Sequence, residues 1–393
     1  MDFMESTFFL RDVGPVPQIL SKPFIPARTA QYKNKEGRIT MKKNSKLVAL
    51  LLAALIVLGS SAAALAEPLT VAVSMRSTAS EYHMQYVAGA QAFVDSLPEG
   101  TAEVQILACE GNDDKQINDI NAVIAAKGDN MILFVDPNNA PNITAIAEAC
   151  EEAGVYWTSA WNTPEGIYPT SYKYWVNHQA CDAVKQGYDI AVTLFNALPT
   201  PGKGNICVLE GMLANSANTY RMQGLQQALK EYPDIKVLDD QAGDWATAKG
   251  LSITENWLAK YDNIDGIWSA CDDMAVGVVQ ALKAKGLNGK VKVTGVDGTS
   301  AAIEMVGTGD LICTIANNGW MQGGYGVAYA YAAKTGVIDT ATMDLKHRMF
   351  YTNGFLVTTE TLPEYKKTFV ESVPVYDYTN LDFPIAKAMD VVK

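Results

Sequence analysis

From residue 69 onward, short apolar runs alternate with longer stretches in which apolar residues recur at helical spacing. The apolar runs resemble buried parallel strands, and they lie at residues 69–73, 104–107, 131–135, 155–158, 206–210, 235–238, 266–269 and 291–296. The helical stretches between them lie at residues 82–96, 115–127, 144–153, 217–230, 247–260 and 274–285. Such alternation predicts parallel sheets covered by helices on both faces. The two successive series predict an α/β fold with two doubly wound lobes.

Residues 41–66 have the three parts of a secretory signal peptide. Lys42, Lys43 and Lys46 precede an apolar run at residues 47–58, and the small-residue cleavage motif Ala64-Leu65-Ala66 follows. A single transmembrane anchor is the competing interpretation, but a helix needs about 20 apolar residues to span a bilayer. The segment therefore predicts a periplasmic or secreted protein that begins at Glu67 after cleavage.

Residues 1–40 precede this segment and contain several prolines but no sustained periodicity. A signal peptide placed so far along the chain would be poorly presented to the export machinery. The pattern favours a start codon that was assigned too far upstream, with Met41 as the true first residue. A functional N-terminal extension is the less favoured alternative. Residues 1–66 are therefore not expected to contribute to the fold.

The remaining 327 residues are enough for two domains. Of the 31 basic and 43 acidic side chains, 9 and 4 lie in residues 1–66, which leaves a net charge of −17 on the rest. A surface this acidic argues against nucleic acid and anionic membranes as partners. The six cysteines are widely spaced, so buried free thiols are expected, although an oxidising compartment would permit disulfides.

The sequence lacks the motifs of common α/β enzymes. The turn at residues 74–80 has no glycine for a dinucleotide or phosphate loop, and no Gly-x-Ser-x-Gly motif occurs. The run from His178 to Asp182 is typical of a solvated helix start rather than of a zinc site. Asp272 and Asp273 are adjacent at a predicted helix start, so one of them is expected to be an N-cap. We therefore expect no metal, no cofactor and no catalytic residue.

Ligands of open α/β sheets bind at the carboxyl ends of the strands, so the residues that follow each predicted strand are candidates. Polar and aromatic side chains gather at these positions. They include Tyr82, His83, Trp161, Asn162, Arg221, Trp245, Cys271 and Asp297. Side chains of these kinds offer the donors, acceptors and aromatic faces that a polar neutral ligand needs.

Several short motifs occur in an order and spacing shared with a known family. They are Arg221-Met222-Gln223-Gly224-Leu225, Asp244-Trp245, Ala270-Cys271-Asp272-Asp273-Met274, Val293-Thr294-Gly295-Val296-Asp297-Gly298-Thr299 and Thr314-Ile315-Ala316-Asn317. On these residues the chain resembles the ribose-binding-like type I periplasmic sugar-binding proteins of ABC transporters. The resemblance covers roughly residues 69–333.

The resemblance implies two lobes joined by a three-segment hinge, which close on a sugar. The N-terminal lobe is then expected at residues 67–177 with 318–351. The C-terminal lobe is expected at residues 178–317 with 352–393.

The resemblance also implies a role for most of the candidates. Tyr82, His83 and Trp245 match aromatic positions that enclose the sugar ring. Arg221 matches an arginine whose planar fork donates to two vicinal hydroxyls, and Asp297 matches a carboxylate that accepts hydroxyl protons. Each residue also has a structural interpretation: a surface ion pair for Arg221, a core contact for Tyr82 or Trp245, and a turn for Asp297.

Asn317 matches an amide position near a hinge crossing. The chain departs from the family pattern at Trp161-Asn162, where the family has Asp-Arg, and at Cys271, where the family has asparagine. The loop between the first strand and Tyr82 is also two residues longer. These departures put ribose in doubt and leave another monosaccharide, a polyol or a cyclitol open.

The main functional hypothesis is an exported, monomeric, non-enzymatic protein that hands a neutral sugar, polyol or cyclitol to an ABC transporter permease. The alternative with the same fold is a periplasmic sensory receptor that presents a signal molecule to a chemoreceptor. An exported carbohydrate-active enzyme would need an acid–base pair, and the sequence shows none with suitable spacing. A repressor is excluded because no helix-turn-helix precedes the first strand.

Overall fold

The computed structural model describes residues 67–371 and 374–389. These described residues belong to one compact unit. The predicted signal peptide and the segment before it lie outside the described residues. Within the described part of the chain, no helix is both long and apolar enough to span a membrane.

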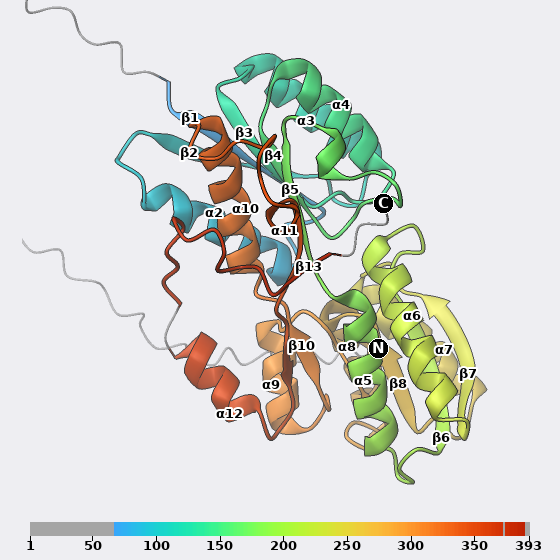
Figure 1. The fold of residues 1–393 in the computed structure, drawn as a ribbon. Coiled ribbons are helices and arrows are strands. Elements are labelled where there is room, and N and C mark those ends of the chain that lie inside the picture. Colours follow the sequence, from blue (N-terminus) through green and yellow to red (C-terminus); the bar gives the residue numbers. More distant parts are fainter. Residues whose placement is uncertain (1–66, 372–373, 390–393) are drawn as a thin grey trace, which may run out of the picture. The chain divides into compact units, whose positions relative to one another are not determined.

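The first lobe is built on a seven-stranded sheet with the strand order β13-β11-β5-β4-β3-β1-β2 (Figure 1). The strands are β1 (Leu69–Met75), β2 (Ala102–Ala108), β3 (Met131–Val135), β4 (Trp157–Ala160), β5 (Trp175–Cys181), β11 (Met349–Thr352) and β13 (Lys387–Ala388). All neighbouring strands are parallel except β11 and β13.

Helices cover both faces of this sheet because successive strand residues point to opposite sides. Phe134 packs in one cluster with α2 (Glu81–Asp95) and α10 (Gly319–Lys334). Its neighbour Leu133 packs in another cluster with α3 (Asp113–Lys127) and α4 (Asn142–Ala153). The apolar runs of the sequence are therefore the central strands of a sheet buried on both faces, as predicted.

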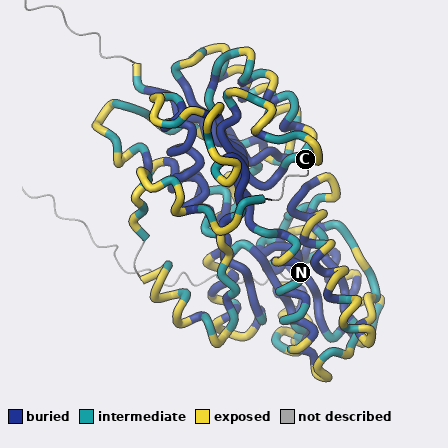
Figure 2. The backbone as a smooth tube through the Cα atoms, in the orientation of Figure 1, coloured by how far each residue is buried: buried dark blue, intermediate teal, exposed yellow. Residues whose placement is uncertain are grey.

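The second lobe is built on a four-stranded parallel sheet with the order β7-β6-β8-β9. The strands are β6 (Gly204–Glu210), β7 (Ile235–Ala242), β8 (Gly266–Ser269) and β9 (Lys292–Val293). The helices are α5 (Ala183–Ala197), α6 (Ser216–Glu231), α7 (Thr247–Lys260), α8 (Asp272–Ala284) and α9 (Ser300–Thr308). Figure 2 shows that the buried backbone follows the sheets of both lobes.

Shorter elements complete the fold. They are η1 (Pro169–Ser171), α11 (Leu345–Arg348), the antiparallel pair β10 (Thr314–Ala316) and β12 (Phe355–Val357), α12 (Leu362–Tyr365) and the π-helical turn η2 (Lys366–Val370). The chain passes between the two lobes after β5, after β10 and after β11. The prediction of an α/β fold with two parallel-sheet lobes is confirmed.

The strand β5 differs from the sequence prediction, which placed a solvated helix start at His178. All residues of β5 are buried, and Nδ1 of His178 lies 2.8 Å from Oγ of Ser159. The helix α5 follows, and the carboxylate of Asp182 accepts a hydrogen bond from a backbone N–H of its first turn. The polar side chains within β5 conceal a buried strand from the apolar pattern.

The C-terminal tail also differs from the prediction, which placed residues 352–393 in the second lobe. Lys387 of β13 pairs with Tyr351 of β11 in the first sheet. The ring of Tyr378 packs edge-on against Phe93 of α2, with 5.5 Å between the ring centroids. The prediction is therefore wrong for residues 374–389, because a two-residue strand carries too little pattern to be assigned from sequence.

Candidate functional site

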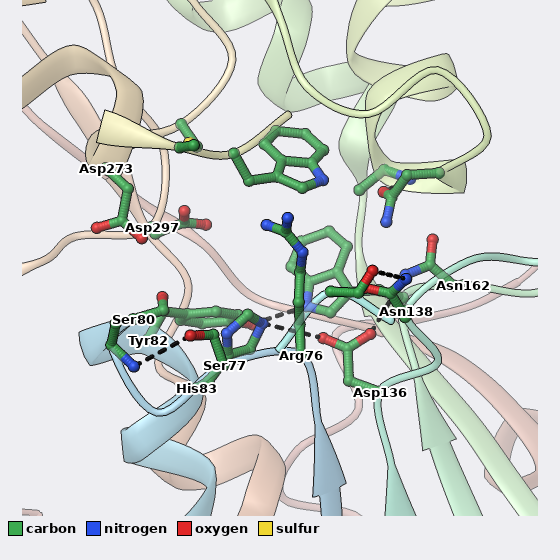
Figure 3. Close-up of a pocket in the computed structure, with 18 of the residues that line it drawn as sticks. Arg76, Ser77, Ser80, Tyr82, His83, Asp136, Asn138, Asn162, Asp273 and Asp297 are labelled. Carbon is green, nitrogen blue, oxygen red and sulfur yellow. Dashed lines mark hydrogen bonds and ion pairs between the residues drawn. The ribbon is translucent and has the colours of Figure 1, made fainter. Parts of the chain in front are cut away.

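A cavity of about 430 Å³ lies between the carboxyl ends of the strands of the two lobes (Figure 3). This volume is in the range of small-molecule sites, roughly 300–1,000 Å³. Eight of the nine candidate residues line it: Tyr82, His83, Trp161, Asn162, Arg221, Trp245, Cys271 and Asp297. The strand-end rule therefore identified side chains that are distant in sequence and adjacent in the fold.

Arg221 is almost fully buried on α6, so a surface ion pair does not describe it. Its Nη1 donates to the carbonyl oxygen of Ala270 at 2.9 Å, and its Nε donates to Oε1 of Gln186 at 3.3 Å. Nη2 lies 3.6 Å from Oδ1 of Asp297. These contacts fix the plane of the guanidinium at the cavity wall, which prepares it to donate to a ligand.

Two tryptophans, one from each lobe, contact the Arg221 guanidinium. Its Cζ lies 5.1 Å from the ring centroid of Trp161 and 5.7 Å from that of Trp245. Both distances are within the range of cation–π attraction. The indole Nε1 of Trp161 donates to the hydroxyl of Tyr82 at 2.8 Å, and that hydroxyl donates to Gln322. The aromatic wall is thus connected by hydrogen bonds as well as by ring contacts.

Trp245 is positioned by its contact with Gly211, the residue that follows β6. A Cβ atom added at Gly211 would lie 1.9 Å from Cη2 of Trp245. Only glycine therefore allows the indole to lie where it does. This contact ties the loop after β7 to the end of β6 and aims the indole at the cavity.

Four residues of the cavity have backbone conformations that non-glycine residues rarely adopt. The φ angle is 51° at Glu110, 58° at Trp161, 59° at Trp245 and 125° at Asp297. Such conformations cost about 1–3 kcal/mol each and persist only where the surrounding structure holds them. Their coincidence in one cavity is typical of a functional site.

Asn317 lies behind the cavity wall rather than in it. It is fully buried, and its Nδ2 donates to Oδ1 of Asp297 at 3.1 Å. Its Oδ1 accepts a hydrogen bond from Nε2 of Gln186 at 2.6 Å. Burial raises the pKa of Asp297 well above its ordinary value, while Arg221 and the Asn317 amide act in the opposite direction. Asn317 therefore positions the carboxylate.

The opposite wall holds His83 and Asp136. Nε2 of His83 lies 3.7 Å from Oδ2 of Asp136, which also accepts a hydrogen bond from the hydroxyl of Tyr86 at 3.3 Å. Asn162 donates to Oδ1 of Asp136 at 3.3 Å. Nδ1 of His83 is buried without a hydrogen-bond partner among the described residues, so it is available to a ligand or a water.

Several cavity residues were not among the candidates from sequence. They include Arg76, Ser80, Glu110, Asp136, Asn138, Asn215 and Asp273. Asp136 comes directly after a predicted strand, and Arg76 comes directly after the observed β1, which is two residues longer than predicted, so a wider use of the strand-end rule would have found both.

The expected N-cap at Asp272 or Asp273 is not observed. Cys271 is the N-cap residue of α8, and its side chain makes no capping hydrogen bond. The buried carboxylate of Asp272 accepts hydrogen bonds from the backbone N–H of Thr299 and the hydroxyl of Thr314, both at 2.8 Å. Asp273 lines the cavity instead. Sequence spacing could not show these long-range partners.

The six cysteines are buried and free, as the sequence predicted. Burial raises the pKa of the Cys271 thiol well above its ordinary value, so this cavity residue is a neutral thiol. Among residues 67–371 and 374–389, no group of three or more His, Cys, Asp or Glu side chains is arranged to hold a metal ion.

The two lobes contact each other directly beside the cavity. Oδ1 of Asn162 in the first lobe accepts a hydrogen bond from the backbone N–H of Ser216 in the second lobe at 2.9 Å. The hydroxyl of Ser216 donates to the carbonyl oxygen of Thr163 at 3.1 Å. The structure therefore shows the lobes closed over the site.

Comparison with known proteins agrees with this architecture. A family model described as periplasmic binding protein domain matches residues 71–336. The chain belongs to the periplasmic binding protein family. A crystal structure of a twin-arginine translocation pathway signal protein from Burkholderia phytofirmans is 33% identical, with a TM-score of 0.79 over 82% of this chain and 99% of that one.

Two further relatives have names that include a ligand. An ABC transporter periplasmic solute binding protein from Actinobacillus succinogenes, solved with bound D-allose, is 28% identical, with a TM-score of 0.66 over 76% of this chain and 100% of that one. A xylitol-binding protein from Mycolicibacterium smegmatis is 38% identical over 136 residues, which are 34% of this chain and 39% of that protein. This chain matches three of its curated relatives over 136 to 155 residues. The match spans only 39% to 51% of the length of those relatives.

Proposed function

We propose that this protein captures a neutral sugar, polyol or cyclitol in the cavity between its lobes and delivers it to an ABC transporter permease. The observation that carries the proposal is the arrangement of Arg221 between two tryptophans and beside Asp297. The guanidinium and the carboxylate are matched to vicinal hydroxyls, and indole rings cover the C–H faces of a sugar.

The named relatives support this ligand class. They include a protein solved with D-allose and a protein named for xylitol, both of which are neutral polyhydroxylated compounds. We further propose that the role is binding without catalysis. Two carboxylates of the site support this, because Asp297 accepts a hydrogen bond from Asn317 and Asp136 accepts hydrogen bonds from Tyr86 and Asn162.

Delivery to a permease would use hinge closure of the two lobes. A ligand that contacts both walls binds the closed form better than the open form and therefore shifts the population toward it. The permease would then recognise the closed pair of lobe surfaces. We also propose export through the signal peptide at residues 41–66, with cleavage near Ala66-Glu67.

The test is thermal unfolding of the purified protein with D-allose, xylitol, myo-inositol and D-ribose. The protein is first unfolded, dialysed and refolded, so that any sugar bound during expression is removed. At least one compound should raise the melting temperature by several degrees, because only native-state binding stabilises the fold. No shift with any neutral sugar, polyol or cyclitol would contradict the proposal.

A further inference from the structure

Arg76 is a second arginine of the cavity. It is the first residue after β1 and lies in the loop that leads to α2. Its side chain lines the cavity and points away from the strand, as Figure 3 shows. The inference drawn from this residue rests on the proposed function, because it concerns the ligand of the same site.

The loop that carries Arg76 is held in place by Glu110. Oε2 of Glu110 accepts a hydrogen bond from the hydroxyl of Ser77 at 2.7 Å, and Oε1 accepts one from the backbone N–H of Thr78 at 3.2 Å. The backbone N–H of Gly111 donates to the carbonyl oxygen of Arg76 at 3.3 Å. The arginine therefore projects from a fixed backbone.

In the part of the chain that the structure describes, the guanidinium of Arg76 has no hydrogen-bond or ion-pair partner. Its Nε is buried without a hydrogen bond, and no ion pair to Arg76 occurs among the described residues. Its planar group lies against Gly111, where an added Cβ would come within 3.3 Å of Nη2. Arg76 as a whole is half-buried, and leaving the buried Nε–H donor unpaired is costly. A structural role through an ion pair therefore does not account for this residue.

Asp273 lies on the other lobe, in the first turn of α8, and lines the same cavity. Burial raises the pKa of Asp273, and the Ser80 hydroxyl, His83 and Arg76 act in the opposite direction. Arg76 and Asp273 therefore line the same cavity from opposite lobes, and no ion pair within 4.0 Å joins them among the described residues. A donor from one lobe and an acceptor from the other are thus both available to a ligand group.

We propose that Arg76 and Asp273 form a second hydroxyl-binding pair, beside Arg221 and Asp297, that determines specificity. Arg76 would donate to neighbouring hydroxyl oxygens of the ligand, and Asp273 would accept a hydroxyl proton of the same ligand. The cavity is lined by two arginines but four carboxylates (Glu110, Asp136, Asp273 and Asp297), so an anionic ligand is disfavoured. The occupant is a neutral compound with enough contiguous hydroxyls to engage both pairs.

The experiment compares the wild type with Arg76→Met, Asp273→Asn and the control Lys285→Met. Met keeps the unbranched stem of Arg76 but removes the guanidinium, and Lys285 is an exposed charge at the other end of α8. Calorimetric titrations use D-allose, myo-inositol, xylitol and the shorter polyol erythritol, with D-gluconate as an acid and D-glucosamine as an amine.

Arg76→Met and Asp273→Asn should each raise the Kd of the best neutral probe by about ten- to a hundredfold, because each removes a charge-assisted hydrogen bond. Both should reduce the preference for the longer probes over erythritol, which a purely structural role would not do. Lys285→Met should bind as the wild type does.

Unchanged Kd and unchanged selectivity in Arg76→Met would overturn the inference while leaving the proposed function intact. Tighter wild-type binding of D-gluconate or D-glucosamine than of every neutral probe would overturn the assignment of a neutral ligand. If the wild type binds none of the neutral probes, the proposed function fails, and this inference fails with it.

Discussion

The carboxylate of Glu81 in the first lobe caps the helix that begins at Ser300 in the second lobe. The backbone N–H of Ser300 donates to Oε1 and Oε2 of Glu81 at 3.1 and 3.0 Å, and the Ser300 hydroxyl donates to Oε1 at 2.7 Å. Glu81 is itself the first residue of α2, so one carboxylate lies at the N-terminal ends of two helices. A carboxylate is favourable there because helix N-termini carry positive potential. This contact joins the two lobes directly.

Removing the Glu81 carboxylate should weaken closure. We expect Glu81→Ala to speed the dissociation of a bound sugar by about three- to tenfold, because the closed state loses exposed but charge-assisted hydrogen bonds. Stopped-flow fluorescence measures the rate. Glu304→Ala, which removes an exposed carboxylate within α9, is the control and should not change the dissociation rate. Equal dissociation rates in wild type and Glu81→Ala would show that the contact does not hold the lobes.

Gly211 should be required for ligand binding although it is not itself a candidate contact. A side chain at Gly211 would overlap the indole of Trp245, so Gly211→Ala should displace the ring and raise the Kd by about tenfold or more. Calorimetric titration measures the Kd, and tryptophan fluorescence reports the displaced ring. Gly307→Ala is the control, because its added Cβ would meet its nearest neighbour, Leu362, at an ordinary 3.4 Å. Wild-type affinity in Gly211→Ala would mean that Trp245 does not contribute to the site.

The sequence predicted the layers of the fold and most of the cavity for one physical reason. Strands buried on both faces form apolar runs, and parallel strands bring the residues after them to one edge of the sheet. Trp161 and Asp297 were found in this way, although they come from different lobes. β5 was missed because polar residues interrupt its apolar pattern although the strand is buried, as at His178, whose ring lies within hydrogen-bond distance of Ser159 on β4.

The finer division of roles could not be predicted, because it depends on contacts between residues far apart in the chain. Asn317 lies behind Asp297 rather than in the cavity. The sequence alone shows that an amide is present at this position, but not whether it faces the ligand or supports the carboxylate. Either Asp272 or Asp273 was expected to cap the helix, but the partners of Asp272 are Thr299 and Thr314. The spacing of residues along the chain indicates which helices and strands pack together. The hydrogen-bond partners of individual side chains are known only from the folded structure.

Asn317 should affect binding through Asp297. Its amide donates to the Asp297 carboxylate and thereby opposes the rise of the Asp297 pKa that burial causes. In Asn317→Ala the pKa of Asp297 should rise further. As the pH is lowered, Asp297 should therefore be protonated, and sugar affinity should fall, at a higher pH than in the wild type. Titrations from pH 5 to pH 8 measure this shift. A uniform loss of affinity with an unchanged pH profile would show that Asn317 is merely structural.

His178 should make the protein less stable as the pH falls. Burial lowers the pKa of His178 to about 3, whereas an unfolded chain has a histidine pKa of about 6.5. Between these two values the unfolded state binds a proton that the folded state does not. The free energy of unfolding therefore falls by about 1.4 kcal/mol for each pH unit below about 6.5, down to about pH 3.

Replacement of His178 by a residue that does not titrate should remove this contribution. Denaturant unfolding of wild type and His178→Gln at pH 4, 5, 6 and 7 isolates it, because the other titrating groups are common to both proteins. The variant is expected to be less stable at pH 7, where it loses the hydrogen bond to Ser159, and to lose less stability than the wild type on acidification. A His347→Gln variant is not a clean control, because the half-buried ring of His347 contacts Tyr329 and Asp382. The comparison therefore rests on how steeply stability changes with pH. Equal slopes in the two proteins would mean that His178 takes up a proton within the folded state.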